Sequence, residues 1–175
     1  MSKSLARVAA ALRTAGLDAQ PVEMSAGTRT AEQAAEAAGC ALDQIVKSIL
    51  FQGESGRLYL FLTAGGNRVD AARASALAGE PLGRADGQTV REVTGFAIGG
   101  VAPLGHLTPL PVWIDPRLME FPLVWAAAGR ATGTTRAEIL ATRMPARHAP
   151  CASRSMTAVS RSVALAARTV RMAVT

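Results

Sequence analysis

A single lysine stands out among the residues whose chemistry could serve a function. Lys47 interrupts the apolar run Ile45–Phe51, whose β-branched residues are typical of a buried strand. Burying an unpaired ammonium group is costly, so a lysine at such a place usually has a partner. The strand pattern alone favours a structural explanation, in which Lys47 lies on the open face of a sheet or pairs with a carboxylate such as Asp43.

A second candidate is the segment Gly95–Gly105, in which the pair Gly99-Gly100 precedes Pro103. Glycines let a backbone approach a ligand and present N–H groups to an anion or a developing oxyanion, and the proline would stiffen the loop. A tight connection between two elements explains the same residues. The segment is neither a P-loop nor a dinucleotide fingerprint, because no Gly-Lys-Ser/Thr follows it and the strand–turn–helix context is missing.

The third candidate, Trp125–Gly129, has small residues before its glycine, which indicates close packing at a strand end. Simple packing explains this segment too. Other chemistries find no support, because the two histidines and two cysteines lack metal-site spacing and Gly-x-Ser-x-Gly is absent. We therefore expect no metal and no cofactor.

The elements that must position these residues follow from periodicity and from glycine stops. Thr30 and Gln33 form a predicted capping box. We expect helices at Lys3–Ala15, Ala31–Ala38 and Val69–Leu77 and from Asp86 to Val93, and strands at Gln20–Met24, Ile45–Phe51, Arg57–Thr63, Val112–Asp115 and Leu123–Ala127. This irregular order predicts an α+β domain with a mixed or antiparallel sheet.

Composition narrows the class of protein. A chain of 175 residues fits one domain, no stretch is long and apolar enough to cross a membrane, and no signal-peptide pattern is seen at the start. We expect a cytoplasmic protein. Residues 1–129 hold 11 Lys+Arg and 12 Asp+Glu, whereas residues 130–175 hold 8 Arg and one acidic residue, Glu138. Such a basic end either binds RNA non-specifically or is simply solvated, and composition favours the second explanation.

Taken together, these segments resemble the YbaK/ProX family of aminoacyl-tRNA deacylases, which is itself similar to the editing domain inserted in many bacterial prolyl-tRNA synthetases. The resemblance covers roughly residues 1–130. The stretches that carry it are, in order, Thr30-Ala-Glu-Gln-Ala-Ala35, Ile45-Val-Lys-Ser-Ile-Leu50, Thr94-Gly-Phe-Ala-Ile-Gly-Gly-Val-Ala-Pro-Leu-Gly-His106 and Val124-Trp-Ala-Ala-Ala-Gly129.

The resemblance implies a compact domain on a curved, barrel-like mixed sheet with flanking helices. It implies that Lys47 is the active-site lysine and that Gly99 and Gly100 form the catalytic part of a substrate-binding loop. The residues expected to contact the substrate are Thr30, Ser48, Ile98, Pro103, His106 and Gly129. Local hydrogen bonding is the simpler explanation of Ser48 and His106.

Members of that family hydrolyse the ester of a mischarged tRNA, often tRNA(Pro) carrying Ala or Cys, without a metal or a covalent nucleophile. The resemblance therefore implies a hydrolase that edits in trans, with prolyl-tRNA synthetase or an elongation factor as candidate helpers. The chain departs from the family after Gly129, where an aromatic-containing strand and a last helix are expected.

We predict a helix at Thr134–Thr142 and a basic amphipathic helix at Val159–Val174. We divide the chain into a domain at 1–130 and an atypical basic segment at 131–175. In one interpretation this segment is partly disordered. A missing last strand would leave an exposed sheet edge. The alternative function is an inactive relative that only binds tRNA or a synthetase. The amino acid removed and the oligomeric state, monomer or weak dimer, stay open.

Overall fold

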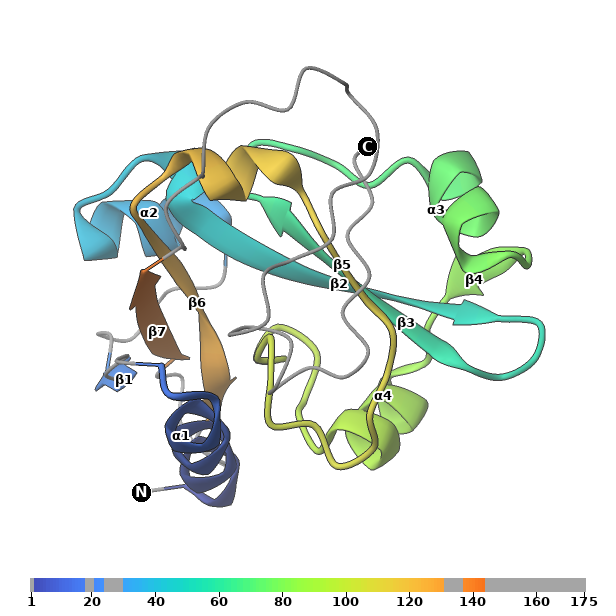
Figure 1. Ribbon diagram of the computed structural model, residues 1–175, viewed down its shortest axis with the longest axis horizontal. Coiled ribbons are helices and arrows are strands. Elements are labelled where there is room, and N and C mark those ends of the chain that lie inside the picture. Colours follow the sequence, from blue (N-terminus) through green and yellow to red (C-terminus); the bar gives the residue numbers. More distant parts are fainter. Residues whose placement is uncertain (1, 18–20, 24–29, 131–136, 144–175) are drawn as a thin grey trace.

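The computed structural model describes residues 2–17, 21–23, 30–130 and 137–143 (Figure 1). The helices are α1 (Lys3–Ala15), α2 (Ala31–Ala38), α3 (Ala71–Ala78) and α4 (Gly87–Thr94), with short 3-10 helices η1 (Leu42–Gln44) and η2 (Pro116–Glu120). The strands are β1 (Pro21–Glu23), β2 (Ile45–Gly53), β3 (Leu58–Ala64), β4 (Leu82–Arg84), β5 (Val112–Ile114), β6 (Leu123–Arg130) and β7 (Ala137–Arg143). The predicted α+β class is confirmed.

The strands form one mixed sheet of seven strands in the order β1-β7-β6-β2-β3-β5, with β4 paired to β2 beside this path. β2 and β3 make the predicted antiparallel hairpin. β2 pairs with β6, and β3 with β5, in parallel. Within the described residues the path ends at β1 and β5, so the sheet is open.

The helix boundaries follow local signals that the sequence already carries. Thr30 and Gln33 form the predicted capping box of α2, each side chain hydrogen-bonding to the backbone of the other residue. Asp86 caps α4 by accepting the N–H groups of Gln88 and Thr89. In the described part of the chain, all four α-helices end at a left-handed glycine, which the absence of a Cβ makes possible.

The two faces of the sheet carry different layers. On the inner face, which we define by Val46, Leu60 and Val124, the strands pack against the residues of α1, α4 and the loop after α4. On the outer face, Tyr59, Phe61 and Trp113 pack against α3, with the rings of Phe61 and Trp113 stacked 5.0 Å apart. Figure 1 shows α1 and α4 on one side of the twisted sheet and α3 on the other.

The predicted helix at Thr134–Thr142 is wrong, because residues 137–143 form strand β7. Their Ala, Glu and Leu content favours a helix, but β7 pairs with β6 on one edge and with β1 on the other. These tertiary pairings override the local preference. β7 also covers the edge of β6 that a missing last strand would have left open, so the sheet extends past residue 130.

Two further differences concern strands. β4 was not predicted, because three residues give too short a pattern to recognise. Gly129 lies inside β6 rather than after its end. β6 has one more residue than β7 between Ala127 and Arg130, and Gly129 adopts a φ of 113° at this bulge. The helix predicted at Val159–Val174 lies outside the described residues.

No helix in the described part of the chain is long and apolar enough to cross a membrane.

Candidate active site

The candidate site lies where β2 separates from β6. β6 pairs with β2 only at Ile45 and Val46, and β4 pairs with the same edge only from Phe51 to Gly53. Among the described residues, β2 therefore has no strand partner on this edge from Lys47 to Leu50. We call this interruption of the sheet the fork, and Figure 1 shows β2 and β6 diverging from it.

Lys47 projects from the fork on the outer face. It is half-buried and lies opposite Thr63 in the β2–β3 register. Its ammonium group donates a hydrogen bond to the backbone carbonyl of Asn67. Asp43 is not its partner, because the Asp43 carboxylate binds Arg117 at 2.9 Å and the N–H of Gly66 at 3.1 Å.

In the described part of the chain, the charge of Lys47 acts on the carboxylate of Glu32 on α2. The pKa of Glu32 is lowered mainly by a hydrogen bond to its own backbone N–H and by the Thr30 hydroxyl, and only in last place by the charge of Lys47. The ammonium group is thus bound by a neutral oxygen, and its charge remains available to a ligand.

Asp115 organises the turn beside Lys47. Its Oδ2 accepts hydrogen bonds from Thr63 Oγ1 at 3.1 Å, from the N–H of Ala64 at 3.1 Å and from Asn67 Nδ2 at 2.8 Å, and its Oδ1 accepts the N–H of Arg117. Burial alone would raise the pKa of Asp115, but these hydrogen bonds together lower it. Sequence reasoning missed this network, although the Asp-Pro pair at the start of η2 was a recognisable capping signal.

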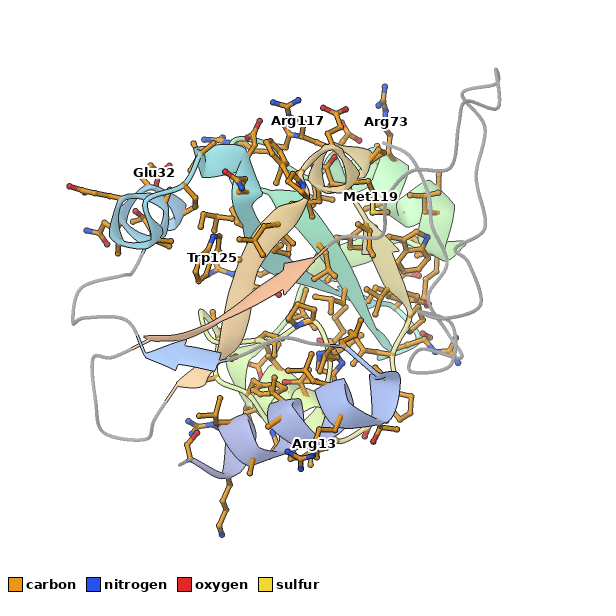
Figure 2. The ribbon with its side chains drawn as sticks, turned by 60° about the vertical axis from the view of Figure 1, so that its left-hand side comes forward. Arg13, Glu32, Arg73, Arg117, Met119 and Trp125 are labelled. Carbon is orange, nitrogen blue, oxygen red and sulfur yellow. The ribbon has the colours of Figure 1, made fainter. Side chains whose placement is uncertain are left out.

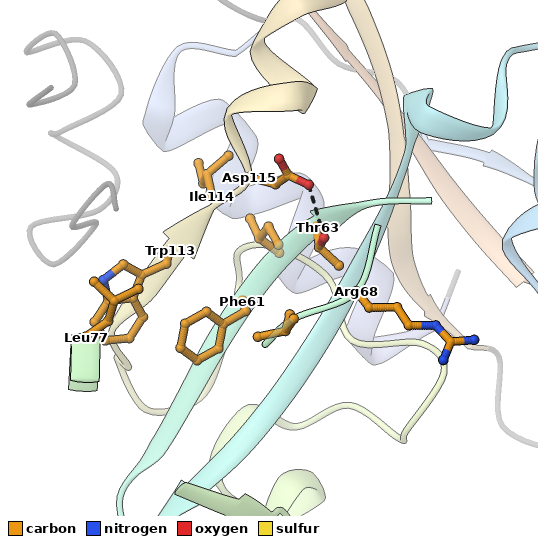
Figure 3. A pocket seen from close by; sticks show the side chains of 9 residues that line it. Phe61, Thr63, Arg68, Leu77, Trp113, Ile114 and Asp115 are labelled. Carbon is orange, nitrogen blue, oxygen red and sulfur yellow. Dashed lines mark hydrogen bonds between the residues drawn. The ribbon is translucent and has the colours of Figure 1, made fainter. Parts of the chain in front are cut away.

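A small hollow adjoins this network on the outer face. It is lined by Phe61, Leu62, Thr63, Arg68, Val69, Leu77, Trp113, Ile114 and Asp115. Figure 3 shows Thr63 bonded to Asp115 at one end, the aromatic rings at the other, and Arg68 directed away. Its volume of about 20 Å³ has room for roughly one water molecule.

The glycine loop approaches the fork from the inner face. Val101 and Ala102 are buried in the same cluster as Ala128 of β6, and Leu50 of β2 packs against that cluster. Gly99 has a φ of 81°, and the N–H of Gly100 donates to the carbonyl of Ala97 at 2.9 Å. Gly100 therefore closes a turn, and its N–H is already in use.

Two other predicted residues of this loop lie beside the glycines. Pro103 is half-buried, whereas the side chain of Ile98 is 59% exposed. Ile98 lies over the start of α4, where its Cδ1 would be 3.3 Å from a Cβ added to Gly87.

Ser48 turns its backbone polar groups away from β3. Ser48 lies opposite Leu62, whose carbonyl accepts the N–H of Asp115 on the β5 side and so faces away from β2. Ser48 and Leu62 are therefore a non-hydrogen-bonded pair, and the N–H and C=O of Ser48 point into the fork. Its Oγ is buried and has no hydrogen-bond partner among the residues that the structure describes. The local hydrogen bond expected for Ser48 is therefore not found.

His106 and Thr30 do make local hydrogen bonds. His106 Nε2 donates to the carbonyl of Ala102 at 2.8 Å, and its ring packs edge-on against Phe96. Desolvation lowers the pKa of His106, against the opposing effect of that hydrogen bond. The Thr30 hydroxyl accepts the N–H of Gln33 as a helix cap. These local contacts explain Thr30 and His106 without a substrate. Lys47, Ser48 and the glycine loop, by contrast, lie at the fork.

Charge around the fork is mixed rather than uniformly basic. Figure 2 shows Arg117 and Arg73 at one end of the molecule and Arg13 on α1 at the other. Arg117 is itself paired with Asp43 and Glu120. In the described ranges, no group of three or more His, Cys, Asp or Glu residues could hold a metal ion.

Comparison with known sequences gives one matching family, described as "Aminoacyl-tRNA editing domain", over residues 25–143. The match includes β7, together with the fork and the glycine loop. The uncharacterised protein YwhH of Bacillus subtilis (strain 168) is 35% identical over 107 residues, which are 61% of this chain and 68% of that protein.

Solved structures show the same fold. A candidate trans-editing enzyme for prolyl tRNA synthetase is 51% identical with a TM-score of 0.72, over 81% of this chain and 88% of that one. The hypothetical protein APE2540 is 23% identical with a TM-score of 0.74, over 95% and 97% of the two chains, and supports the fold alone.

Proposed function

The chain belongs to the family of aminoacyl-tRNA editing domains, and on that premise we propose that it hydrolyses the ester bond between a wrongly attached amino acid and its tRNA. The observation that carries this proposal is the charge at the fork. Lys47 is held by the neutral carbonyl of Asn67 rather than by a carboxylate, so it can attract an anion. Aminoacyl-tRNA offers two such groups, the phosphate of its last nucleotide and the developing oxyanion of its ester.

An aminoacyl ester is already activated, so the enzyme needs position and charge more than a strong nucleophile. A water molecule adds to the carbonyl carbon, the ester C–O bond breaks, and the ribose oxygen leaves with a proton. We propose that Lys47 holds the substrate and that backbone N–H groups at the fork stabilise the oxyanion. Gly99 is the candidate donor of the glycine pair, because Gly100 uses its N–H within the turn.

The proposed substrate is tRNA(Pro) carrying a small amino acid such as Ala or Cys, removed in trans. The description of the structure that is 51% identical, a candidate trans-editing enzyme for prolyl tRNA synthetase, supports this choice. Residues 1–129 are nearly neutral in charge, which favours help from the synthetase or an elongation factor in holding tRNA. We propose that the protein works in the cytoplasm, where aminoacyl-tRNA is used.

The direct test is a panel of tRNA(Pro) charged with Ala, Cys, Ser or Pro. We expect at least one wrong ester to be lost far faster than in buffer, while correctly charged Pro-tRNA(Pro) is spared. If every ester decays at its buffer rate, the proposed function is wrong.

One observation favours the second candidate, a binding module without catalysis. Residues 144–175 contain five arginines and no acidic residue, a composition suited to counterion release on RNA. This candidate predicts tRNA binding that weakens steeply with salt and is lost when residues 144–175 are removed. The cut falls after β7, because that strand belongs to the sheet.

A further inference from the structure

The backbone carbonyl of Asn67 holds the ammonium group of Lys47. We call the turn at residues 64–67, together with Asp115, the socket of Lys47. We propose that Asn67 and Asp115 are positioning residues, which act on the substrate through Lys47 without contacting it. This inference rests on the proposed function for its catalytic meaning, but the geometry of the socket is independent of it.

The socket is built on the turn formed by residues 64–67. Its own backbone closes through the N–H of Asn67, which donates to the carbonyl of Ala64 at 3.0 Å. Asp115 then binds the turn at both ends, through the N–H of Ala64 and the side-chain amide of Asn67. Together these bonds set the direction of the Asn67 carbonyl, which accepts the hydrogen bond from Lys47.

The middle of the turn is fixed as firmly as its ends. The N–H of Gly66 donates to Asp43 at 3.1 Å. Gly65 lies so close to η1 that a Cβ added to it would be 2.1 Å from the carbonyl oxygen of Leu42. The turn therefore has little freedom to move, because η1 holds its middle and Asp115, the N-cap of η2, holds its two ends.

Fixing a lysine matters because its long side chain can adopt many rotamers and so carries much conformational entropy. A free ammonium group would lose that freedom when the substrate binds, whereas a group already held contributes its charge at less cost. The partner is also chemically suited to the task. A carbonyl restrains the ammonium group without neutralising it, and the nearby carboxylates of Asp43 and Asp115 are engaged with other donors.

The chain offers a sharp test, because its two lysines are Lys3 and Lys47. Protein labelled with ¹⁵N-lysine gives one side-chain signal for each, and Lys3, exposed on α1, is an internal reference. We expect the Nζ of Lys47 to be more ordered than that of Lys3, and Asn67→Ala to remove the difference. Gln52→Ala is the matched control, since it also deletes a side-chain amide that donates one hydrogen bond, here to the carbonyl of Gly56 at the other end of β2. An unchanged Lys47 signal in Asn67→Ala would overturn the proposal.

Kinetics give the second readout. We expect Asn67→Ala to lower kcat/KM about tenfold, with an unfolding midpoint close to that of Gln52→Ala, since displacing a positioning group by a fraction of an ångström is costly. In a Lys47→Ala background the same substitution should have no further effect. An equal loss in both backgrounds would show that Asn67 acts independently of Lys47. If the Lys47 signal loosens but no ester is hydrolysed by the wild type, the socket stands and the proposed function fails.

Discussion

Lys47 and Thr63 lie opposite each other on the outer face of the β2–β3 hairpin, and the Thr63 hydroxyl donates a hydrogen bond to Asp115. Thr63 is only 5% exposed, so this bond anchors the network beneath the site. The lysine is thus placed by residues far from it in sequence.

The close packing of Gly65 predicts a large effect of one methyl group. Gly65→Ala should lower the free energy of unfolding by about 1–3 kcal/mol, because its Cβ would overlap the backbone oxygen of Leu42. Gly83→Ala is the control, since the nearest atom to its Cβ, the Gln52 oxygen, is 4.0 Å away. Urea denaturation of both variants measures the difference, and equal stabilities would contradict the packing described for the turn.

Because the Ser48 hydroxyl has no partner in the described part of the chain, we expect its removal to weaken substrate binding without lowering the free energy of unfolding. Ser48→Ala should leave the free energy of unfolding unchanged or raise it by up to about 1 kcal/mol, because a buried hydroxyl without a partner is unfavourable. If the hydroxyl meets the substrate, KM for the mischarged tRNA should rise several-fold.

Thr94→Val is the matched comparison for Ser48→Ala. The Thr94 hydroxyl is fully buried, donates to the carbonyl of Val90 and accepts the N–H of Phe96. Losing it should cost about 1–3 kcal/mol. A Ser48→Ala protein that is as destabilised as Thr94→Val, with unchanged KM, would count against a role at the fork.

The buried imidazole of His106 predicts a loss of stability in mild acid. Because desolvation lowers the pKa of His106 below its ordinary value of 6.5, the unfolded chain binds the proton more readily. The contribution of this group is present above pH 6.5 and is lost as the pH falls below it. Urea midpoints at pH 7.5 and 5.5 should differ less for His106→Gln than for the wild type, and an equal difference would show that other groups cause the loss.

Local signals explain which parts of the fold were predictable. The capping box at Thr30 and the glycine that ends each helix act within a few residues, so the sequence shows them directly. The β2–β3 hairpin combines two apolar runs with a short turn, and it too is local. The segment Ala137–Arg143 was misassigned because its residues suit a helix and only its neighbours in the sheet make it a strand.

The site was less predictable than the fold, because it depends on long-range contacts. Lys47 and the glycine loop stood out by residue type, but nothing in the sequence pairs Asn67 with Asp115, 48 positions later. The fork likewise exists because β6 leaves β2 to follow β7, which is a property of the whole sheet. Residue types therefore indicated the chemistry, and only the structure showed what holds it in place.

The role of the Lys47 charge is best measured by single-turnover hydrolysis of Ala-tRNA(Pro) or Cys-tRNA(Pro), whichever the wild type cleaves. Lys47→Ala should lower the rate about 100-fold, because without the charge that holds the substrate the ester is misplaced against the attacking water. Lys47→Arg, which keeps the charge but not the shape, should retain part of the rate, and Lys3→Ala all of it. A Lys47→Ala protein that folds normally and hydrolyses the ester at the wild-type rate would show that this charge has no part in the reaction.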